Sequence, residues 1–85
     1  MSTLLNIEPV AYSEQIAGNV RAIAAMRGLN QTSLARELGA AQSAINMKWR
    51  GKRQWQLEDL QSVAIVLGVS PWTLTSPLYE NWVPR

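Results

Sequence analysis

The stretch from Asn30 to Arg53, NQTSLARELGAAQSAINMKWRGKR, decides the fold of this 85-residue chain. It predicts two short helices joined by a tight turn. The side chain of Asn30 is suited to cap an open backbone amide at the start of the first helix. Gly39 follows that helix at the position where a helix end favours positive φ. The second helix is expected over about 41–50, with Gly51 ending it.

An ordered set of small, apolar and polar residues extends this pattern along most of the chain. Its members are Gly28-Leu29-Asn30-Gln31, Leu34-Ala35, Leu38-Gly39, Gln42-Ser43, Ile45, Gly51-Lys52 and Leu67-Gly68-Val69-Ser70. The set resembles the helix-turn-helix proteins of the XRE type, the lambda repressor and Cro family of phage and bacterial regulators. The resemblance covers roughly residues 20–74 and implies an all-α, compact five-helix lambda-repressor-like domain, with the helix-turn-helix at about 30–50.

Apolar periodicity and capping residues predict the other three helices. The first is expected over Tyr12–Arg27, with Ser13 as its N-cap and a buried stripe of Ile16, Val20, Ile23 and Ala24. Another is expected over 57–67, with Leu57, Leu60, Val63 or Ala64, and Leu67 facing the core. Ser70 and Pro71 begin a short last helix whose Trp72 and Leu74 are expected to close the core.

This pattern divides the chain into three parts: an N-terminal arm over 1–11, the helix-turn-helix domain over 12–75, and a C-terminal aromatic tail over 76–85. Pro9 interrupts the weak helical pattern of the arm. The tail carries Leu78, Tyr79, Trp82 and Val83, large side chains that are costly to leave in water. We expect the tail to make a contact, either within its own subunit or with a dimer partner or another protein.

The composition excludes several classes of protein. The chain has no cysteine and no histidine, so it offers no disulfide, no cysteine or histidine metal site and no histidine-dependent catalytic triad. Its six carboxylates are dispersed, which predicts that it is not an enzyme and holds no cofactor. No apolar run is long enough for a membrane span, and no small-molecule ligand is expected. A cytoplasmic protein of a bacterial or phage-infected cell is the default.

The positive charge is concentrated in one part of the chain. The net charge of the whole chain is only +2. Between Arg21 and Arg53, however, seven basic residues stand against Glu37 alone, which leaves +6 in that segment. Such a segment suits a polyanionic partner, although a solvated surface would also account for it.

The helix at 41–50 is the candidate recognition helix, because such a helix enters the major groove with its N-terminal residues facing base edges. By the resemblance, Gln42, Ser43 and Met47 occupy base-reading positions, and Asn46 lies on the same face. A glutamine or asparagine can pair with adenine, a serine with several bases, and an apolar side chain can pack on a thymine methyl.

Seven residues are candidates for binding phosphate. Asn30 and Gln31 begin a helix whose open amides and dipole attract an anion, and in the related repressors Gln31 braces the first base-reading residue, here Gln42. The remaining candidates are basic: Arg21, Lys48, Arg50, Lys52 and Arg53. Arg36 and Glu37 are interpreted as solvated surface.

Two positions depart from the family pattern. The family commonly pairs an arginine with a glutamate where this chain has Ala24 and Trp49, and we expect Trp49 to pack over Ala24. Lys48 stands where an apolar residue is usual. It either buries its stem and extends its ammonium group to phosphate, or the recognition helix is rotated and Trp49 takes the core position. Trp55, in the linker after the basic pair, is expected to cap the core rather than stack on DNA.

The resemblance implies a sequence-specific regulator of double-stranded DNA, most like a Cro protein or a minimal repressor, acting as a homodimer on a palindromic operator. Two alternatives stay open. One is an antitoxin-like or accessory module whose tail binds a protein partner. The other is a recombination directionality factor that binds DNA mainly to bend it.

Overall fold

A computed structural model describes the backbone of residues 9–76 and the side chains of residues 12–76. Five helices make up this part of the chain: α1 (Pro9–Met26), α2 (Gln31–Leu38), α3 (Gln42–Trp49), α4 (Leu57–Leu67) and α5 (Pro71–Thr75). The all-α, five-helix architecture is therefore confirmed. No helix among the described residues has the length and apolarity needed to cross a membrane.

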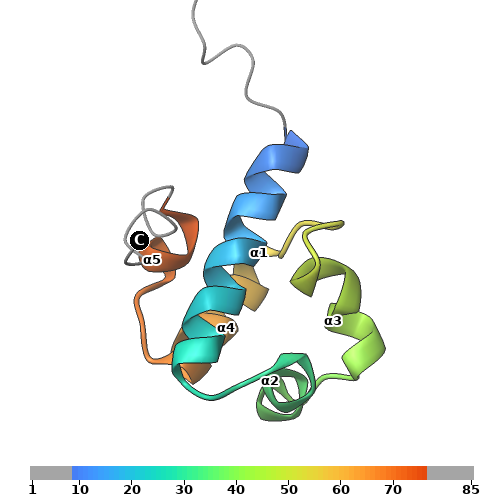
Figure 1. The fold of residues 1–85 in the computed structure, drawn as a ribbon, viewed down its shortest axis with the longest axis vertical. Coiled ribbons are helices and arrows are strands. Elements are labelled where there is room, and N and C mark those ends of the chain that lie inside the picture. The colour runs from blue at the N-terminus through green and yellow to red at the C-terminus, as the bar shows by residue number, and fades with distance from the viewer. Residues whose placement is uncertain (1–8, 77–85) are drawn as a thin grey trace, which may run out of the picture.

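The long helix α1 runs through the middle of the domain; α3, α4 and α5 pack against it, and α2 packs against α3 and α4 (Figure 1). α5 lies on one side against α1 and α4, and α2 and α3 form the helix-turn-helix on the other side. The core is built from the inward faces of all five helices and from Trp55 of the linker. Its buried apolar residues include Ile16, Val20, Ile23, Ala24, Leu34, Ala35, Ile45, Trp55, Leu60, Val63, Ala64, Leu67 and Leu74. The predicted stripe of α1 is thus confirmed.

Local signals set the ends of α2 and the start of α5. The Asn30 side-chain oxygen accepts a hydrogen bond from the Ser33 amide at 2.9 Å, and the Ser33 hydroxyl accepts one from the Asn30 amide at 2.8 Å. Gly39 ends α2 with a φ of 69°, in the left-handed region. At the other end of the domain, Ser70 caps α5, and Pro71 is its first residue. The predicted helix-end roles of Asn30, Gly39, Ser70 and Pro71 are all confirmed.

Three expectations about individual residues are wrong. Helix α1 begins at Pro9 rather than at Tyr12, and Ser13 is a buried residue within it instead of its N-cap. Proline is well placed in a first helical turn, where its missing N–H has no acceptor to lose. Leu57 and Trp72, expected in the core, are 83% and 79% exposed, because each lies in the first turn of its helix, at the edge of the packed face.

The arm and the tail lie almost wholly outside the described residues, so the contact expected of the tail stays a prediction. The linker tryptophan Trp55 is 6% exposed and belongs to the core, which confirms that it caps the core. Ala24 is fully buried, and Trp49 is half-buried against the same core. Both positions agree with the expected packing of Trp49 over Ala24, although the contact itself stays a prediction.

Candidate nucleic-acid interface

The predicted recognition helix α3 is anchored on one side only. Ile45 is its buried residue, and Trp49 packs partly against the core. On the other side, Gln42, Ser43 and Met47 are exposed, and Asn46 is half-buried. The structure therefore presents the four predicted base-reading residues on the outward face of α3.

A shallow hollow of about 400 Å³ joins the beginning of α2 to the beginning of α3. Gln31, Gln42, Ser43 and Asn46 line it. Each of the four carries at least one hydrogen-bond donor and one acceptor, so the hollow can complement the mixed donor and acceptor pattern of a base edge. Residues from two helices, separated by the turn at Gly39, are thus brought to one polar concavity.

Within the hollow, the Asn46 side-chain amide donates to the Gln31 side-chain oxygen at 3.4 Å. The sequence led us to expect that Gln31 would brace Gln42, but the structure pairs it with Asn46, one turn further along α3. The Gln31 amide nitrogen is buried and has no partner among the described residues. A buried donor without an acceptor is unfavourable, so this amide group is left with unused hydrogen-bonding capacity beside the hollow.

The starts of both helices face this region with unused backbone amides. The first amides of an α-helix have no acceptor within the helix. At α2, the Asn30 cap satisfies the amide of Ser33, which leaves those of Gln31 and Thr32. At α3, the N-cap residue is Ala41, which supplies no side-chain acceptor. Asn30 therefore serves as a helix cap, while the neighbouring amides remain suited to an anion.

Two of the predicted phosphate-binding cations have partners within the domain. The Lys48 ammonium group forms an ion pair with the Asp59 carboxylate of α4 at 2.6 Å and lies 5.9 Å from the centre of the Trp55 ring. Its side chain is only 19% exposed, so the stem is buried as expected, but the ammonium group is directed to Asp59. Arg21 of α1 donates to the Trp49 backbone carbonyl oxygen at 2.6 Å. A positive charge at the C-terminal end of a helix also interacts favourably with its dipole.

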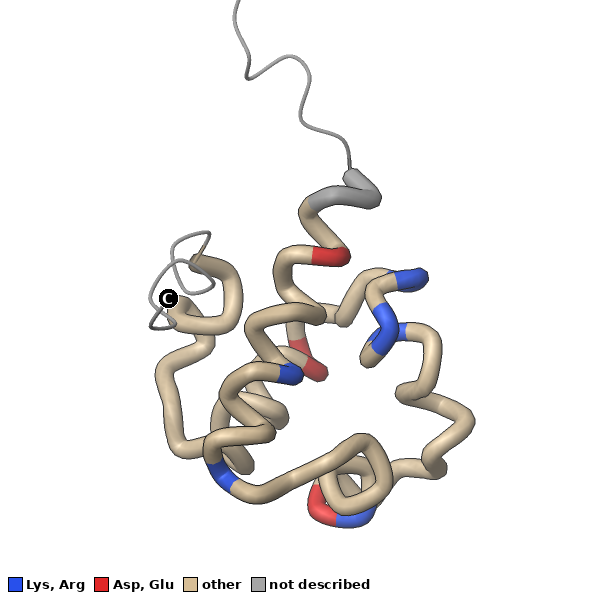
Figure 2. The backbone as a smooth tube through the Cα atoms, in the orientation of Figure 1, with Lys and Arg blue, Asp and Glu red and all other residues tan. Residues whose placement is uncertain are grey.

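The other three predicted phosphate-binding cations are exposed to solvent. Arg50, Lys52 and Arg53 are exposed and form no side-chain hydrogen bond or ion pair with another described residue. They follow α3 in the turn and linker (Figure 2), where basic residues gather beside the helix. The sequence did not distinguish these cations from Lys48 and Arg21, because the partners Asp59 and Trp49 are 11 and 28 residues away along the chain.

Two solved structures are similar to this domain. A hypothetical transcription factor, NHTF, from Neisseria matches with a TM-score of 0.74 and 26% sequence identity over 82% of this chain and 80% of that one. The restriction-modification controller protein C.AhdI from Aeromonas hydrophila matches with a TM-score of 0.67 and 26% identity over 73% of this chain and 94% of its own. No protein-family model and no curated protein matches the chain.

The fold and these similarities define the class of protein. The chain has the five-helix lambda-repressor-like fold that the sequence resemblance implied, and it matches the structures of two helix-turn-helix proteins of the XRE type. Both similar proteins are described as regulators, which agrees with the prediction that this chain is not an enzyme.

Proposed function

We propose that this chain is a sequence-specific transcriptional regulator of double-stranded DNA, of the Cro or repressor kind. The outward face of α3 would lie in the major groove, with Gln42 and Ser43 reading base edges and Asn46 and Met47 contacting bases one turn further on. The observation that carries the proposal is the hollow between α2 and α3, where three of these residues meet Gln31.

The surroundings of the hollow supply the phosphate contacts. The amides at the start of α2 would bind one phosphate, while Arg50, Lys52 and Arg53 would follow the backbone on the other side of the groove. In this arrangement Lys48 and Arg21 act indirectly, since their ion pair and hydrogen bond hold α3 on α4 and α1. Base contacts give the sequence preference, and the exposed cations give affinity for any DNA.

Regulators of this kind bind palindromic operators as dimers, with half-sites about 34 Å apart on one face of the DNA. We propose the same for this chain, with repression arising when a bound homodimer blocks RNA polymerase. A phage origin would be consistent with the resemblance to Cro.

The experiment is a fluorescence-anisotropy titration with DNA from the protein's own locus and with a scrambled duplex, over a series of salt concentrations. We expect the wild-type chain to prefer the locus DNA by about a thousandfold. The double substitution Gln42→Ala/Ser43→Ala should remove most of that preference and leave binding to the scrambled duplex unchanged.

Gln61→Ala/Ser62→Ala is the matched control, since it removes the same pair of side chains from an exposed part of α4. It should keep the full preference. Weak and equal binding to both duplexes by the wild-type chain would overturn the proposal of sequence-specific reading. So would a preference for the locus DNA that survives the α3 double substitution.

A further inference from the structure

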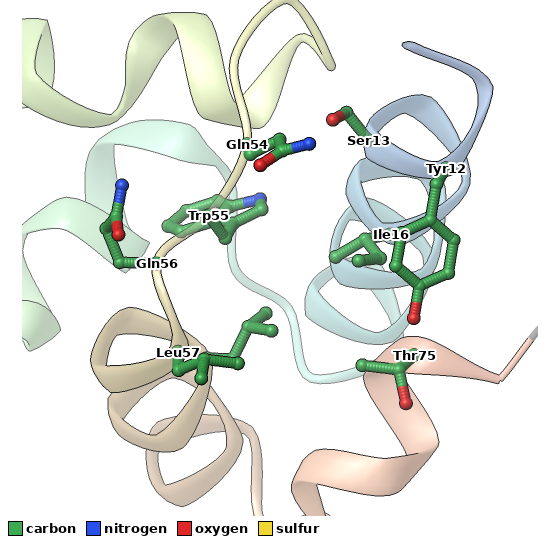
Figure 3. Close-up of a pocket in the computed structure, with 9 residues that line it drawn as sticks. Tyr12, Ser13, Ile16, Gln54, Trp55, Gln56, Leu57 and Thr75 are labelled. Atoms are coloured by element: carbon green, nitrogen blue, oxygen red, sulfur yellow. The ribbon is translucent and has the colours of Figure 1, made fainter. Parts of the chain in front are cut away.

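A cavity of about 300 Å³ lies away from the hollow, where α1, the linker after α3, α4 and the end of α5 meet (Figure 3). Ile16, Leu60 and the Trp55 ring give it an apolar wall. Tyr12 and Leu57 stand at its edge, and they are 44% and 83% exposed. Figure 3 shows Trp55, Leu57, Ile16 and Tyr12 arranged around one space. The cavity is therefore open to solvent at this edge, and the described residues leave its apolar side chains uncovered there.

The Trp55 ring, which forms part of this wall, also carries an unused hydrogen-bond donor. Trp55 is only 6% exposed, and its indole nitrogen is buried without an acceptor among the described residues. In Figure 3 this nitrogen lies at the end of the ring nearest α1. A buried tryptophan N–H normally finds an acceptor, so the occupant should offer both apolar groups and an oxygen atom.

The end of α5 is fixed beside this cavity. The side-chain amide of Asn19, a fully buried residue of α1, donates to the Leu74 carbonyl oxygen at 2.9 Å and to the Ser76 carbonyl oxygen at 2.8 Å. Between them, Thr75 lines the cavity. The chain therefore leaves the described domain at a defined point next to the cavity, with the nine residues 77–85 still to follow.

We propose that residues 77–85 of the same chain occupy this cavity. They carry four large apolar side chains, Leu78, Tyr79, Trp82 and Val83, and their backbone carbonyls offer acceptors for the Trp55 indole. Nine extended residues reach about 30 Å, more than a cavity next to their point of attachment requires. A tether this short gives an effective concentration in the millimolar range, which favours the chain's own tail over that of a second copy.

The test is hydrogen exchange of the Trp55 indole proton, followed by NMR in the full-length chain. In the wild-type chain this proton should be protected. Leu78→Ala/Trp82→Ala should make it exchange at least about tenfold faster, because the tail then covers the cavity for less of the time. Trp72→Ala is the matched control, since it removes a tryptophan that is 79% exposed and does not line the cavity, and it should leave the exchange rate unchanged.

Two further measurements make the result decisive. Backbone amide exchange within α1 and α4 should be the same in all three proteins, which separates opening of the cavity from unfolding of the domain. The protection should also be independent of protein concentration. Fast indole exchange in the wild-type chain, or equal exchange in the tail variant, would overturn the proposal. Protection that rises with concentration would overturn it too, by assigning the cavity to the tail of a second copy.

Discussion

Polar and charged side chains have partners within the domain on the inward side of α3, whereas those on its outward side are exposed. On the inward side, Lys48 is paired with Asp59, and Arg21 is bonded to the Trp49 carbonyl oxygen. On the outward side, Gln42 and Ser43 are exposed. Beyond the helix, Lys52 is exposed too, and its side chain has no partner among the described residues. Near α3, Lys48 and Arg21 have partners within the domain, whereas Lys52 has none among the described residues, so position beside the helix alone does not identify the cations proposed to contact DNA.

The largest expected effect comes from the apolar anchor of the inward side. Ile45→Ala should lower the free energy of unfolding by about 2–5 kcal/mol, since Ile45 is 4% exposed in the core. That is a large share of the roughly 5–15 kcal/mol by which small domains are stable. Ile65→Ala, at a residue that is 75% exposed, is the control and should change stability by less than about 0.5 kcal/mol. Urea denaturation followed by circular dichroism measures both, and equal midpoints would contradict the anchoring role.

An effect of comparable size is expected at the glycine that follows α3. Gly51 has a φ of 80°, and a Cβ there would lie 3.1 Å from the Glu14 Cα of α1. Gly39, at the end of α2, has a φ of 69°, but a Cβ added there would meet no other described part of the chain within 4 Å. Gly39→Ala should therefore cost about 1–2 kcal/mol from backbone strain alone. Gly51→Ala should cost about 1–3 kcal/mol more, because the added methyl group presses on backbone. Thermal unfolding of the two variants compares them, and equal destabilisation would show that the linker does not depend on close contact with α1.

The ion pair between α3 and α4 should contribute less. Asp59 accepts from the Lys48 ammonium group and, at 3.3 Å, from the Gln56 amide at the start of α4. Asp59→Ala should lower stability by about 1–2 kcal/mol, through loss of a helix cap and a half-buried pair. Glu58→Ala removes a neighbouring exposed carboxylate and serves as the control. A double-mutant cycle with Lys48→Ala isolates the pair itself, and a coupling energy of zero would mean that the pair does not help to orient α3.

The smallest effect should appear in the salt dependence of DNA binding. Lys52→Ala should lower the slope of log K against log salt by about 1, the contribution of one phosphate contact, and leave the unfolding temperature unchanged. Lys48→Ala should do the reverse, with a lower unfolding temperature and nearly the same slope. Anisotropy titrations at several salt concentrations, together with thermal unfolding of each variant, measure both quantities. A lower salt slope for Lys48→Ala, together with a lower unfolding temperature for Lys52→Ala, would contradict the distinction between the two sides of α3.

The sequence is most informative where the structure depends on neighbours along the chain. The ends of α2 follow from Asn30 and Gly39, and those of α4 follow from the linker and Gly68, because capping is a local interaction. The predicted ends of α3 agree with the structure to within one residue. The start of α1 is the exception, because Pro9 suggests an interruption of the helical pattern, whereas a proline is equally suited to a first helical turn.

The sequence is least informative about contacts between distant residues. Apolar periodicity assigns Leu57 to the core, but whether a residue at the edge of a stripe is covered depends on the helix that packs against it. The pairing of Lys48 with Asp59, the bond from Arg21 to Trp49 and the pairing of Gln31 with Asn46 have no signal in spacing. Only the three-dimensional arrangement separates the cations that have partners within the domain from those that have none among the described residues.

The most direct test of the central claim is a two-dimensional ¹H–¹⁵N NMR titration of the wild-type chain with a duplex from its own locus. The account predicts that the side-chain amides of Gln31, Gln42 and Asn46 and the backbone amides of Ser43 and Lys52 shift most. The side-chain amide of Gln61 in α4, outside the proposed interface, should barely move. Shifts concentrated in α4 and α5, with Gln42 and Asn46 unchanged, would contradict the claim that the outward face of α3 binds DNA.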